Sequence, residues 1–299
     1  MLTVHTANDF MRRELVTLSP DTPLMEGVNL LLKHRITGAP VVSHTGEYLG
    51  VFSEKCCFKA LLPRVDACQT RGAELAQAPS FMAKELLVLR PEADVFESID
   101  KLLAKRVSGA PVLDAQGQFQ GSFSEKTAMR VLVTSAYDGV PGGVVGSYMN
   151  PDQRRIIDEH TSVLDATERF RTTPYRRLPV LRAGTLLGQV SRRDVLLAGD
   201  TLVRAMGEEA SDKVVGDFMD NQARTIEPGA DLLTMAQIFE DTPYRRLPVL
   251  EGQQLAGQVS RRDVLRKAAE ILRPAPERHH AEVLYLSPLL EEAPPELQP

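Results

Sequence analysis

Cysteine is scarce in this chain of 299 residues, and its arrangement argues against two classes of protein. The three cysteines, Cys56, Cys57 and Cys68, make an odd number, and none of them stands in a C-x-x-C spacing. Disulfide-stapled domains carry paired cysteines, and structural zinc sites carry closely spaced ligands. We therefore expect neither a disulfide framework nor a zinc site.

Long hydrophobic runs are missing as well. No stretch approaches the roughly 20 apolar residues that a membrane span needs, and residues 1–15 contain no apolar core of signal-peptide length. The formal net charge of −5 at pH 7 argues against nonspecific binding to nucleic acid or to membranes. These features predict a cytoplasmic protein with no nucleic-acid or membrane partner. Its length and its 43% apolar residues predict about two domains with a sizeable core.

One passage of the chain occurs twice. TPYRRLPVL occupies both Thr173–Leu181 and Thr242–Leu250, and GQVSRRDVL occupies both Gly188–Leu196 and Gly257–Leu265. Each string recurs 69 residues after its first copy, which indicates an internal duplication. The retained residues include arginine pairs, a serine and an aspartate. Maintenance of the fold alone would mostly require the apolar positions, so the polar identities indicate a further role.

Weaker copies of the same passage lie upstream. TGAPVV at Thr37–Val42 is echoed by SGAPVL at Ser108–Leu113, and FSEK occurs twice at the same separation of 71 residues. An aromatic residue followed by methionine opens each of the resulting units. The chain therefore contains four related units of roughly 70 residues, which form two pairs. The four openings are Phe10-Met11, Phe81-Met82, Tyr148-Met149 and Phe218-Met219.

The fourth unit shows the pattern of secondary structure most clearly. Its residues predict the order β-α-β-β-α, with Ser260 as the N-cap of the last helix, and the other three units repeat this order. The fold class is therefore α/β (α+β). A single unit has a three-stranded sheet too small to cover its own apolar faces, so pairing of units is expected. The expected elements are a strand at Arg224–Ile226, a helix at Asp231–Glu240, strands at Leu247–Leu250 and Leu255–Val259, and a helix at Arg261–Leu272.

This pattern resembles the cystathionine-β-synthase (CBS) domain, and two such units in tandem resemble a Bateman module. The strongest marks are the hydrophobic-Pro-Val turn, found once per unit, and the Gly-x-x-[Ser/Thr]-x-x-Asp element, which is complete in the two last units. The resemblance implies four β-α-β-β-α CBS repeats paired into two Bateman modules. The expected boundaries are a first module at 1–136, a linker at 137–147, a second module at 148–272, and a Pro-rich acidic tail at 273–299.

By this resemblance, an adenosine-containing ligand is expected in the cleft between paired units, and the doubled residues suit that chemistry. Asp194 and Asp263 stand three residues after a serine, in the first turn of a predicted helix. A carboxylate accepts two hydrogen bonds, which suits the vicinal hydroxyls of a ribose. Ser191 and Ser260 lie at the same helix starts, where free backbone N–H groups favour an anion.

The arginine pairs directly precede the Leu-Pro-Val strands. Guanidinium groups bind phosphate in a bidentate manner, and arginine rather than lysine in both copies indicates geometry as well as charge. In the regulatory γ subunit of the AMP-activated kinase, which the chain resembles, the side chains two and three residues before the proline reach the phosphates. The matching positions here are Arg177 and Arg176 in one copy, and Arg246 and Arg245 in the other.

The expected ligand site extends to an early strand of each unit. Backbone groups at Thr225 and Ile226, and at Ile156 and Ile157, could line an adenine slot, although ordinary sheet residues are the alternative interpretation. The full set predicted to bind ligand is Arg176, Arg177, Ser191, Arg193, Asp194, Thr225, Arg245, Arg246, Ser260, Arg262 and Asp263.

Each motif also has a purely structural interpretation. Ser-x-x-Asp resembles a capping box, which stabilises the start of a helix without any ligand. The arginine pairs could be solvated or held in ion pairs with acidic residues. Arg192, Arg193, Arg261 and Arg262 are expected on the exposed first turn of a helix. An interaction scaffold that binds no small molecule is therefore the competing hypothesis.

The first pair of units departs from the motifs. Cys56 and Thr127 occupy the aspartate positions, and our sequence alignment sets Ile36-Thr37 and Val107-Ser108 against the arginine pairs. At these positions the first pair therefore has no carboxylate to bind a ribose and no guanidinium to bind a phosphate. We expect the first pair to be a structural or partner-binding module, with a different ligand as the alternative.

The sequence thus predicts a non-catalytic protein that holds no prosthetic group. Residues 148–272 are expected to bind an adenine nucleotide (AMP, ADP, or ATP with Mg²⁺), and the protein is expected to signal this binding to an unknown protein effector. Both arginine pairs are expected near the pseudo-twofold axis, where two bound phosphates repel each other unless the arginines neutralise them. Occupancy of the two sites should therefore be coupled. The open alternatives are a ligand-free scaffold or a sensor of NAD, a dinucleotide or S-adenosylmethionine. A homodimer formed through the CBS modules is a further option.

Overall fold

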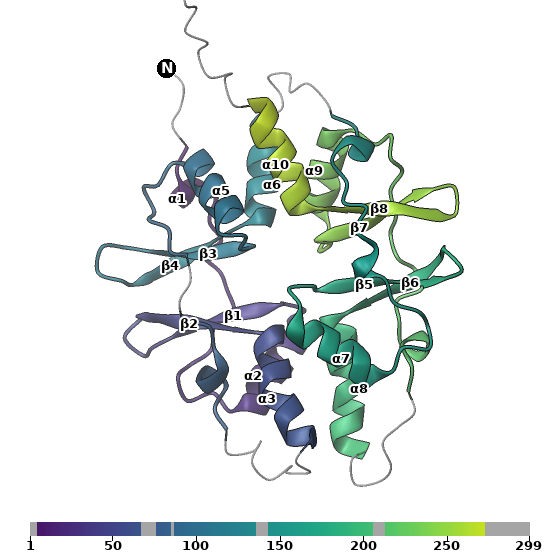
Figure 1. The fold of residues 1–299 in the computed structure, drawn as a ribbon. Coiled ribbons are helices and arrows are strands. Elements are labelled where there is room, and N and C mark those ends of the chain that lie inside the picture. Colours follow the sequence, from purple (N-terminus) through teal and green to yellow (C-terminus); the bar gives the residue numbers. More distant parts are fainter. Residues whose placement is uncertain (1–4, 67–75, 85–86, 136–142, 206–212, 273–299) are drawn as a thin grey trace, which may run out of the picture.

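The computed structural model describes residues 5–66, 76–84, 87–135, 143–205 and 213–272. The predicted tail at 273–299, most of the predicted linker and Cys68 lie outside these residues. In Figure 1 the two units of the first pair lie on one side of the molecule, and the two units of the second pair lie on the other. Their β-hairpins face one another in the middle, with helices above and below.

Each unit consists of a helix, a β-hairpin and a second helix, as the pattern predicted. The predicted helix Arg261–Leu272 is observed with these bounds as α10, and the predicted helix Asp231–Glu240 is α9, with Asp231 as its N-cap. The helices are α1 (Ala7–Phe10), α2 (Leu24–Lys33), α3 (Glu54–Asp66), α5 (Val95–Ala104), α6 (Glu125–Ser135), α7 (Val163–Thr172), α8 (Arg192–Ala205), α9 (Leu232–Asp241) and α10 (Arg261–Leu272). The strands are β1 (Gly38–Val42), β2 (Tyr48–Ser53), β3 (Gly109–Leu113), β4 (Phe119–Ser124), β5 (Arg177–Arg182), β6 (Thr185–Ser191), β7 (Arg246–Glu251) and β8 (Gln254–Ser260).

The first strand predicted for each unit is reduced to a single residue. In the fourth unit only Ile226 forms a bridge, which is parallel and joins it to Val249 of β7. The N–H of Ile226 donates to the Pro248 carbonyl, and its carbonyl accepts from the N–H of Leu250. The prediction of a three-stranded sheet was therefore wrong in detail, because one residue of pairing does not extend into a ladder. The equivalent bridges are Leu18↔Val41, Leu89↔Val112 and Ile157↔Val180.

The strands pair differently in the two halves of the molecule. In the second pair, β5, β6, β8 and β7 form one four-stranded sheet, which is joined at its centre by Thr185 of β6 and Gln254 of β8. In the first pair, β1–β2 and β3–β4 are separate hairpins that meet at an isolated bridge between Glu47 and Gln118. Antiparallel pairing within each hairpin follows the same register in all four units.

The aromatic-Met segments open the units in the sequence, but in space each lies on the other unit of its pair. Asn150, directly after Tyr148-Met149, pairs with Gln258 of the fourth unit, and Asp220, directly after Phe218-Met219, pairs with Gln189 of the third. The segments of the first pair are exchanged in the same way. This exchange joins the two units of a pair through backbone hydrogen bonds. The short 3-10 helices in these segments are η1 (Ala78–Phe81), η3 (Val145–Ser147) and η5 (Val215–Asp217). A further one, η4 (Gln153–Arg155), precedes Ile157, which forms the bridge to Val180.

The hydrophobic core has two parts, and each part combines one unit from each pair. In one, Phe58 of the first unit stacks on Phe170 of the third, with ring centroids 6.3 Å apart. In the other, helix α6 of the second unit packs against α9 and α10 of the fourth. The two pairs are therefore joined through helices, whereas the units within a pair are joined through strands (Figure 1).

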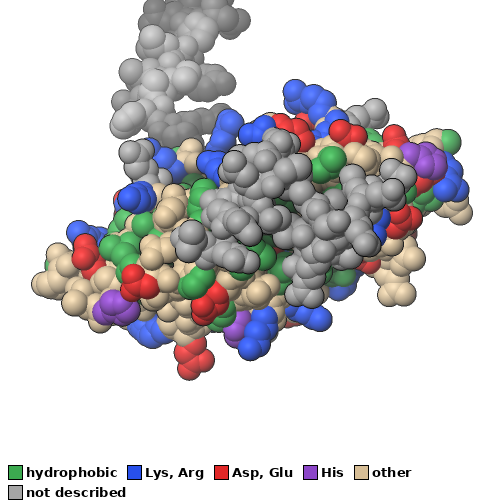
Figure 2. All heavy atoms as spheres, turned by 90° about the horizontal axis from the view of Figure 1, so that it is seen from below, with side chains coloured by type: hydrophobic (Ala, Val, Ile, Leu, Met, Phe, Trp, Pro, Cys, Tyr) green, Lys and Arg blue, Asp and Glu red, His purple; other side chains and the backbone are tan. Residues whose placement is uncertain are grey.

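Basic and acidic side chains are interspersed on the face that Figure 2 shows, over the part of the surface drawn in colour. No helix among the described residues is long and apolar enough to cross a membrane.

Candidate functional site

The two helix-start aspartates have the same environment. Oδ2 of Asp263 accepts hydrogen bonds from the backbone N–H and the hydroxyl of Ser260, at 2.8 and 2.5 Å. Oδ2 of Asp194 accepts the corresponding bonds from Ser191, both at 2.7 Å. The predicted N-cap at Ser260 is confirmed, because the serine hydroxyl also accepts from the Asp263 N–H. One carboxylate oxygen of each aspartate thus stabilises the helix start, and the other oxygen of Asp263 lies 3.8 Å from Nη1 of Arg266.

The second arginine of each pair has an unsatisfied donor. Nη1 of Arg177 and Nη1 of Arg246 are buried and have no hydrogen-bond partner among the described residues. A buried guanidinium N–H without an acceptor costs free energy. The same unsatisfied atom occurs at equivalent positions of two units, which indicates a place where an anion fits.

Each of these arginines meets residues of the other unit in the pair. The guanidinium carbon of Arg177 lies 5.5 Å from the ring centroid of Tyr244. The pKa of Arg246 is lowered to about 10, chiefly by burial and also by the nearby charge of Arg155, while the charge of Asp263 opposes the shift. Arg155 in turn lies 4.5 Å over the ring of Tyr175. The geometry therefore defines two sites, each built from both units of the second pair.

We call these the Asp263 site and the Asp194 site. The Asp263 site contains Arg246 and Asp263 of the fourth unit with Arg155 and Tyr175 of the third. The Asp194 site contains Arg177 and Asp194 of the third unit with Tyr244 of the fourth, while Arg224, which is equivalent to Arg155, is directed toward Ile238. The sequence prediction missed the two tyrosines, although both lie inside the doubled string TPYRRLPVL.

The first arginine of each pair lies at the centre of the molecule. Arg176 donates from Nη2 to the hydroxyl of Ser108 at 3.0 Å and from Nη1 to that of Thr37 at 3.4 Å. Arg245 donates to the same two hydroxyls, at 3.2 Å to Ser108 and 2.8 Å to Thr37. The two guanidinium groups therefore share their acceptors. We call this set of four residues the central junction.

The strand register corrects the alignment of the first pair. Gly38 pairs with Ser53 as Arg177 pairs with Ser191, so Arg176 is equivalent to Thr37. By the same register Arg245 is equivalent to Ser108 and Arg246 to Gly109. The alignment that set the arginine pairs against Ile36-Thr37 and Val107-Ser108 was wrong by one residue. The central junction thus brings together equivalent positions of all four units.

Two buried glutamates of the first pair face this centre. Glu54 and Glu125 expose 6% and 7% of their surface, so a carboxylate in either place is largely cut off from water. Desolvation raises the pKa of Glu54, and the charges of Arg176 and Arg245 partly offset this. Desolvation also lowers the pKa of Arg245 to about 9. These glutamates were not predicted, although the repeated string FSEK contains both of them.

The arginines that follow the serines do not all lie on an exposed helix turn, so that expectation was wrong. Arg192 and Arg261 are buried, and Nη2 of Arg261 donates to the carbonyls of Phe239 and Thr242. Arg193 and Arg262 reach the first pair instead. Nη2 of Arg193 donates to the Leu32 carbonyl at 2.8 Å, and Nη2 of Arg262 donates to Oε1 of Glu125 at 3.0 Å.

The first pair lacks the corresponding ligand groups. Sγ of Cys56 lies 3.2 Å from the hydroxyl of Ser53, and the hydroxyl of Thr127 lies 3.1 Å from that of Ser124. The helix-start cap is therefore present without a carboxylate. Half-buried Lys126 donates from Nζ to the Thr242 carbonyl at 3.4 Å, so it contributes to the contact between the pairs.

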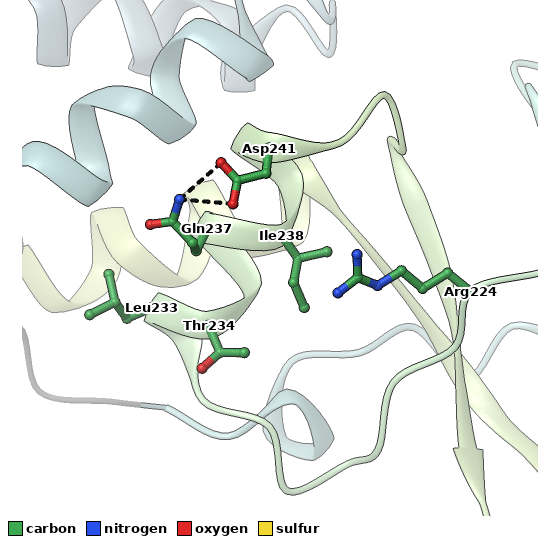
Figure 3. A pocket seen from close by; sticks show the side chains of 6 residues that line it. All are labelled: Arg224, Leu233, Thr234, Gln237, Ile238 and Asp241. Carbon is green, nitrogen blue, oxygen red and sulfur yellow. Dashed lines mark hydrogen bonds between the residues drawn. The ribbon is translucent and has the colours of Figure 1, made fainter.

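Arg224, which precedes Thr225, lines a hollow of about 470 Å³ together with residues of α9. Figure 3 shows the side chain of Arg224 directed toward Ile238 across this hollow, with Gln237 bonded to Asp241 beside it. Neither the backbone N–H nor the carbonyl of Thr225 has a hydrogen-bond partner among the described residues. The region where an adenine slot was predicted thus has free backbone groups in the fourth unit. The described residues contain no group of three or more potential metal ligands.

The four units define a tandem-repeat α/β fold, and the family model for the CBS domain matches four stretches of the chain, 7–63, 78–134, 145–200 and 215–270. The chain belongs to the CBS domain family. The third match begins at 145, inside the stretch predicted as linker, where Val145 is fully buried.

The chain is similar in sequence or in structure to three other proteins. The chain is 25% identical over 192 residues to protein MJ1225 of Methanocaldococcus jannaschii, a match that covers 62% of the chain and 67% of that protein. It is 27% identical over 201 residues to the human 5′-AMP-activated protein kinase subunit γ-3, covering 62% of the chain but only 40% of the subunit. The crystal structure of MJ1225 superposes with a TM-score of 0.78 at 21% identity, covering 88% of this chain and 99% of that one. A Pyrococcus horikoshii protein superposes with a TM-score of 0.59 at 18% identity, over 88% and 100%.

Proposed function

We propose that this chain is a non-catalytic regulatory protein that binds adenine nucleotides at the Asp263 and Asp194 sites. In this proposal AMP, ADP or ATP, the last with Mg²⁺, is a ligand and no prosthetic group is held. Binding changes the packing between the two pairs, and a protein effector responds to that packing. The first pair supplies the surface against which the change occurs.

The observation that carries this proposal is the pair of unsatisfied guanidinium nitrogens, Nη1 of Arg177 and Nη1 of Arg246. Each belongs to a site that also holds a helix-start aspartate. A guanidinium donor suits a phosphate oxygen, and a carboxylate oxygen suits the hydroxyls of a ribose. A nucleotide monophosphate unit satisfies both groups at once.

The family relationship supports the choice of adenine. The human γ-3 subunit belongs to a 5′-AMP-activated protein kinase, and it shares 27% of residues with this chain over 201 positions. S-adenosylmethionine fits less well, because its sulfonium would meet Arg155 and Arg246, which already repel each other.

The ligand-free scaffold is the second candidate, and a specific observation favours it. Arg176 and Arg245, predicted to reach phosphates, are hydrogen-bonded to Thr37 and Ser108 of the first pair. In a scaffold, the same bonds and the serine–aspartate caps would serve only to join the units.

Isothermal titration calorimetry with AMP, ADP and ATP distinguishes the two candidate functions when the wild-type protein is compared with the Asp194→Asn and Asp263→Asn variants. Asparagine retains an oxygen that can accept from the capping serine, so the helix start is kept. The second acceptor for the ribose is lost, so we expect affinity at the altered site to fall by about tenfold or more. The thermal midpoint should change little.

The scaffold hypothesis predicts the opposite result. It expects no nucleotide heat in any variant, and only a stability loss of about 0.5–2 kcal/mol when each aspartate is replaced by alanine. A thermal-shift screen that shows no response of the wild-type protein to adenine nucleotides, but a clear response to NAD or a dinucleotide, would redirect the proposal to that ligand.

A further inference from the structure

We propose that Arg169 occupies the base-recognition edge of the Asp263 site, so that the two nucleotide sites are unequal and this one residue sets the difference. The inference rests on the proposed function, and it names the regulation of the same sites. Sequence alone indicated two pseudo-symmetric sites, because the doubled strings are identical. The difference lies outside those strings.

The bridge residues fix the direction of the backbone groups beside them. In the third unit, Ile157 donates to the Pro179 carbonyl and accepts from the N–H of Leu181, so both of its polar groups point into the sheet. Successive residues of an extended chain direct their polar groups to opposite sides. The carbonyl of Ile156 therefore points away from the sheet, and the edge it forms is not covered by another strand.

The two units treat this edge differently. Nη1 of Arg169 donates to the Ile156 carbonyl at 2.9 Å. In the fourth unit the residue equivalent to Arg169 is Ile238, which has no donor, and the carbonyl of Thr225 has no partner among the described residues. Ile238 and Arg224, the residue before Thr225, both line the hollow of about 470 Å³ (Figure 3).

The chemistry of adenine makes this difference matter. The exocyclic amino group of adenine is a donor and the adjacent ring nitrogen is an acceptor, so an exposed backbone carbonyl and N–H form a complementary edge. At Thr225 both groups are free. At Ile156 one lone pair of the carbonyl already accepts from Arg169, so an adenine amino group has to compete with the guanidinium for that oxygen.

The occupied edge belongs to the Asp263 site. The segment that leads to Ile156 pairs with the fourth unit at Asn150 and Gln258, two residues before Ser260 and the Asp263 cap, and the charge of Arg155, which precedes Ile156, acts on Arg246. The free edge at Thr225 is the counterpart by the repeat symmetry and belongs to the Asp194 site. The Asp194 site is therefore the tighter of the two for an adenine base, and the Asp263 site fills second.

Exchange of the two equivalent residues tests this directly. Calorimetric titration of the full-length protein with AMP should show two unlike sites in the wild type. Arg169→Ile gives the third unit the residue found at the equivalent position of the fourth. It should raise the affinity of the weaker site for AMP by about tenfold, so that the two affinities become alike. Ile238→Arg copies the third unit into the fourth and should weaken the tighter site. Arg171→Ile is the control. It removes another cation from α7 but keeps the hydrogen bond from Arg169 to the Ile156 carbonyl.

The outcomes separate the inference from the proposed function. Two equal sites in the wild type, or an unchanged weaker site in Arg169→Ile, overturn the inference while nucleotide binding stands. No nucleotide heat in the wild type and in any variant overturns both. Circular dichroism and the thermal midpoint establish that each variant is folded, and the reciprocal effect of Ile238→Arg is a second, independent readout.

Discussion

Two adjacent arginines in each doubled string have different surroundings although their chemistry is the same. Arg177 is the first residue of β5, and Arg176 directly precedes it. Because successive side chains of an extended segment point to opposite faces, Arg176 reaches the central junction while Arg177 faces the Asp194 site. The sequence showed that both arginines matter. It could not divide their roles, because the acceptors of Arg176 come from Thr37 and Ser108 in the other pair.

The buried carboxyl of Glu54 leads us to expect that the stability of the protein depends on pH. Its pKa is raised in the folded protein by desolvation, so the folded state binds more protons than the unfolded state above the ordinary value of 4.5. Stability from this group is fully present below pH 4.5 and is lost as pH rises through the folded pKa. We expect Glu54→Gln to raise the thermal midpoint relative to the wild type at pH 8, and the difference to disappear near pH 4.

The surface carboxyl of Glu168 provides a control of opposite sign. Its hydrogen bond to Arg171 lowers its pKa, so its contribution is present above pH 4.5 and is lost as pH falls through the folded pKa. Glu168→Gln should therefore lower the midpoint slightly at pH 8 and leave it unchanged at low pH. A stability profile of Glu54→Gln that ran parallel to that of Glu168→Gln would contradict the account of Glu54.

At the scale of elements, the glycine of the Gly-x-x-Ser-x-x-Asp motif has a structural cause. A Cβ on Gly188 would lie 2.5 Å from the carbonyl oxygen of Asp220, and one on Gly257 would lie 3.0 Å from that of Asn150. Both oxygens belong to the exchanged aromatic-Met segments. The glycine therefore permits the close approach by which the segment of one unit pairs with the hairpin of the other. The first residue of the motif thus has a role in the fold, and its last residue, the aspartate, belongs to the proposed ligand site.

This close approach predicts a graded effect of alanine. Gly188→Ala should lower the free energy of unfolding by about 1–3 kcal/mol, because the backbone of the exchanged segment must move away. Gly257→Ala should cost less, since its contact is longer. Gly229→Ala is the matched control, because a Cβ there meets nothing within 4 Å, and it should be nearly neutral. Urea denaturation measures all three, and equal losses at Gly188 and Gly229 would exclude this cause.

Local elements were predictable to different degrees for physical reasons. The helix Arg261–Leu272 and its cap at Ser260 followed from apolar periodicity and capping chemistry, both of which are local. The strand expected at Arg224–Ile226 is one bridged residue, because pairing depends on how the chain beyond it is placed. The exchange of the aromatic-Met segments was likewise not predictable, since the sequence shows their order along the chain and not the unit that each one contacts.

At the scale of the whole molecule, the two pairs depend on each other. Periodicity identified the apolar faces of the helices, but it could not show that the second unit packs on the fourth and the first on the third. Two polar contacts between the pairs follow the same division, with Glu125 bonded to Arg262 and the Leu32 carbonyl bonded to Arg193, whereas the central junction crosses it. Both of these arginines adjoin a helix-start aspartate. The first pair therefore contacts the residues next to both ligand sites, although it has no site of that kind itself.

The central junction makes the final prediction, which concerns cooperation between the pairs. Thr37→Val and Ser108→Ala each remove one of the two hydroxyls that both Arg176 and Arg245 contact. Each single change leaves every guanidinium one acceptor, so we expect losses of about 1–3 kcal/mol. The double change leaves two neighbouring like charges without either acceptor, and its loss should exceed the sum of the single losses.

A double-mutant cycle by urea denaturation measures this excess. The control is the pair Ser43→Ala and Thr45→Val, whose hydroxyls lie 2.8 Å apart on an exposed turn of the first unit with no arginine between them. Its cycle should show only a small coupling, because water replaces the lost partner at the surface. If the junction cycle is additive within about 0.5 kcal/mol, the two arginines do not share their acceptors in solution. In that case the pairs are held together by their apolar cores and by the contacts of Arg193 and Arg262, and a ligand that moves Arg176 would have no direct effect on Arg245.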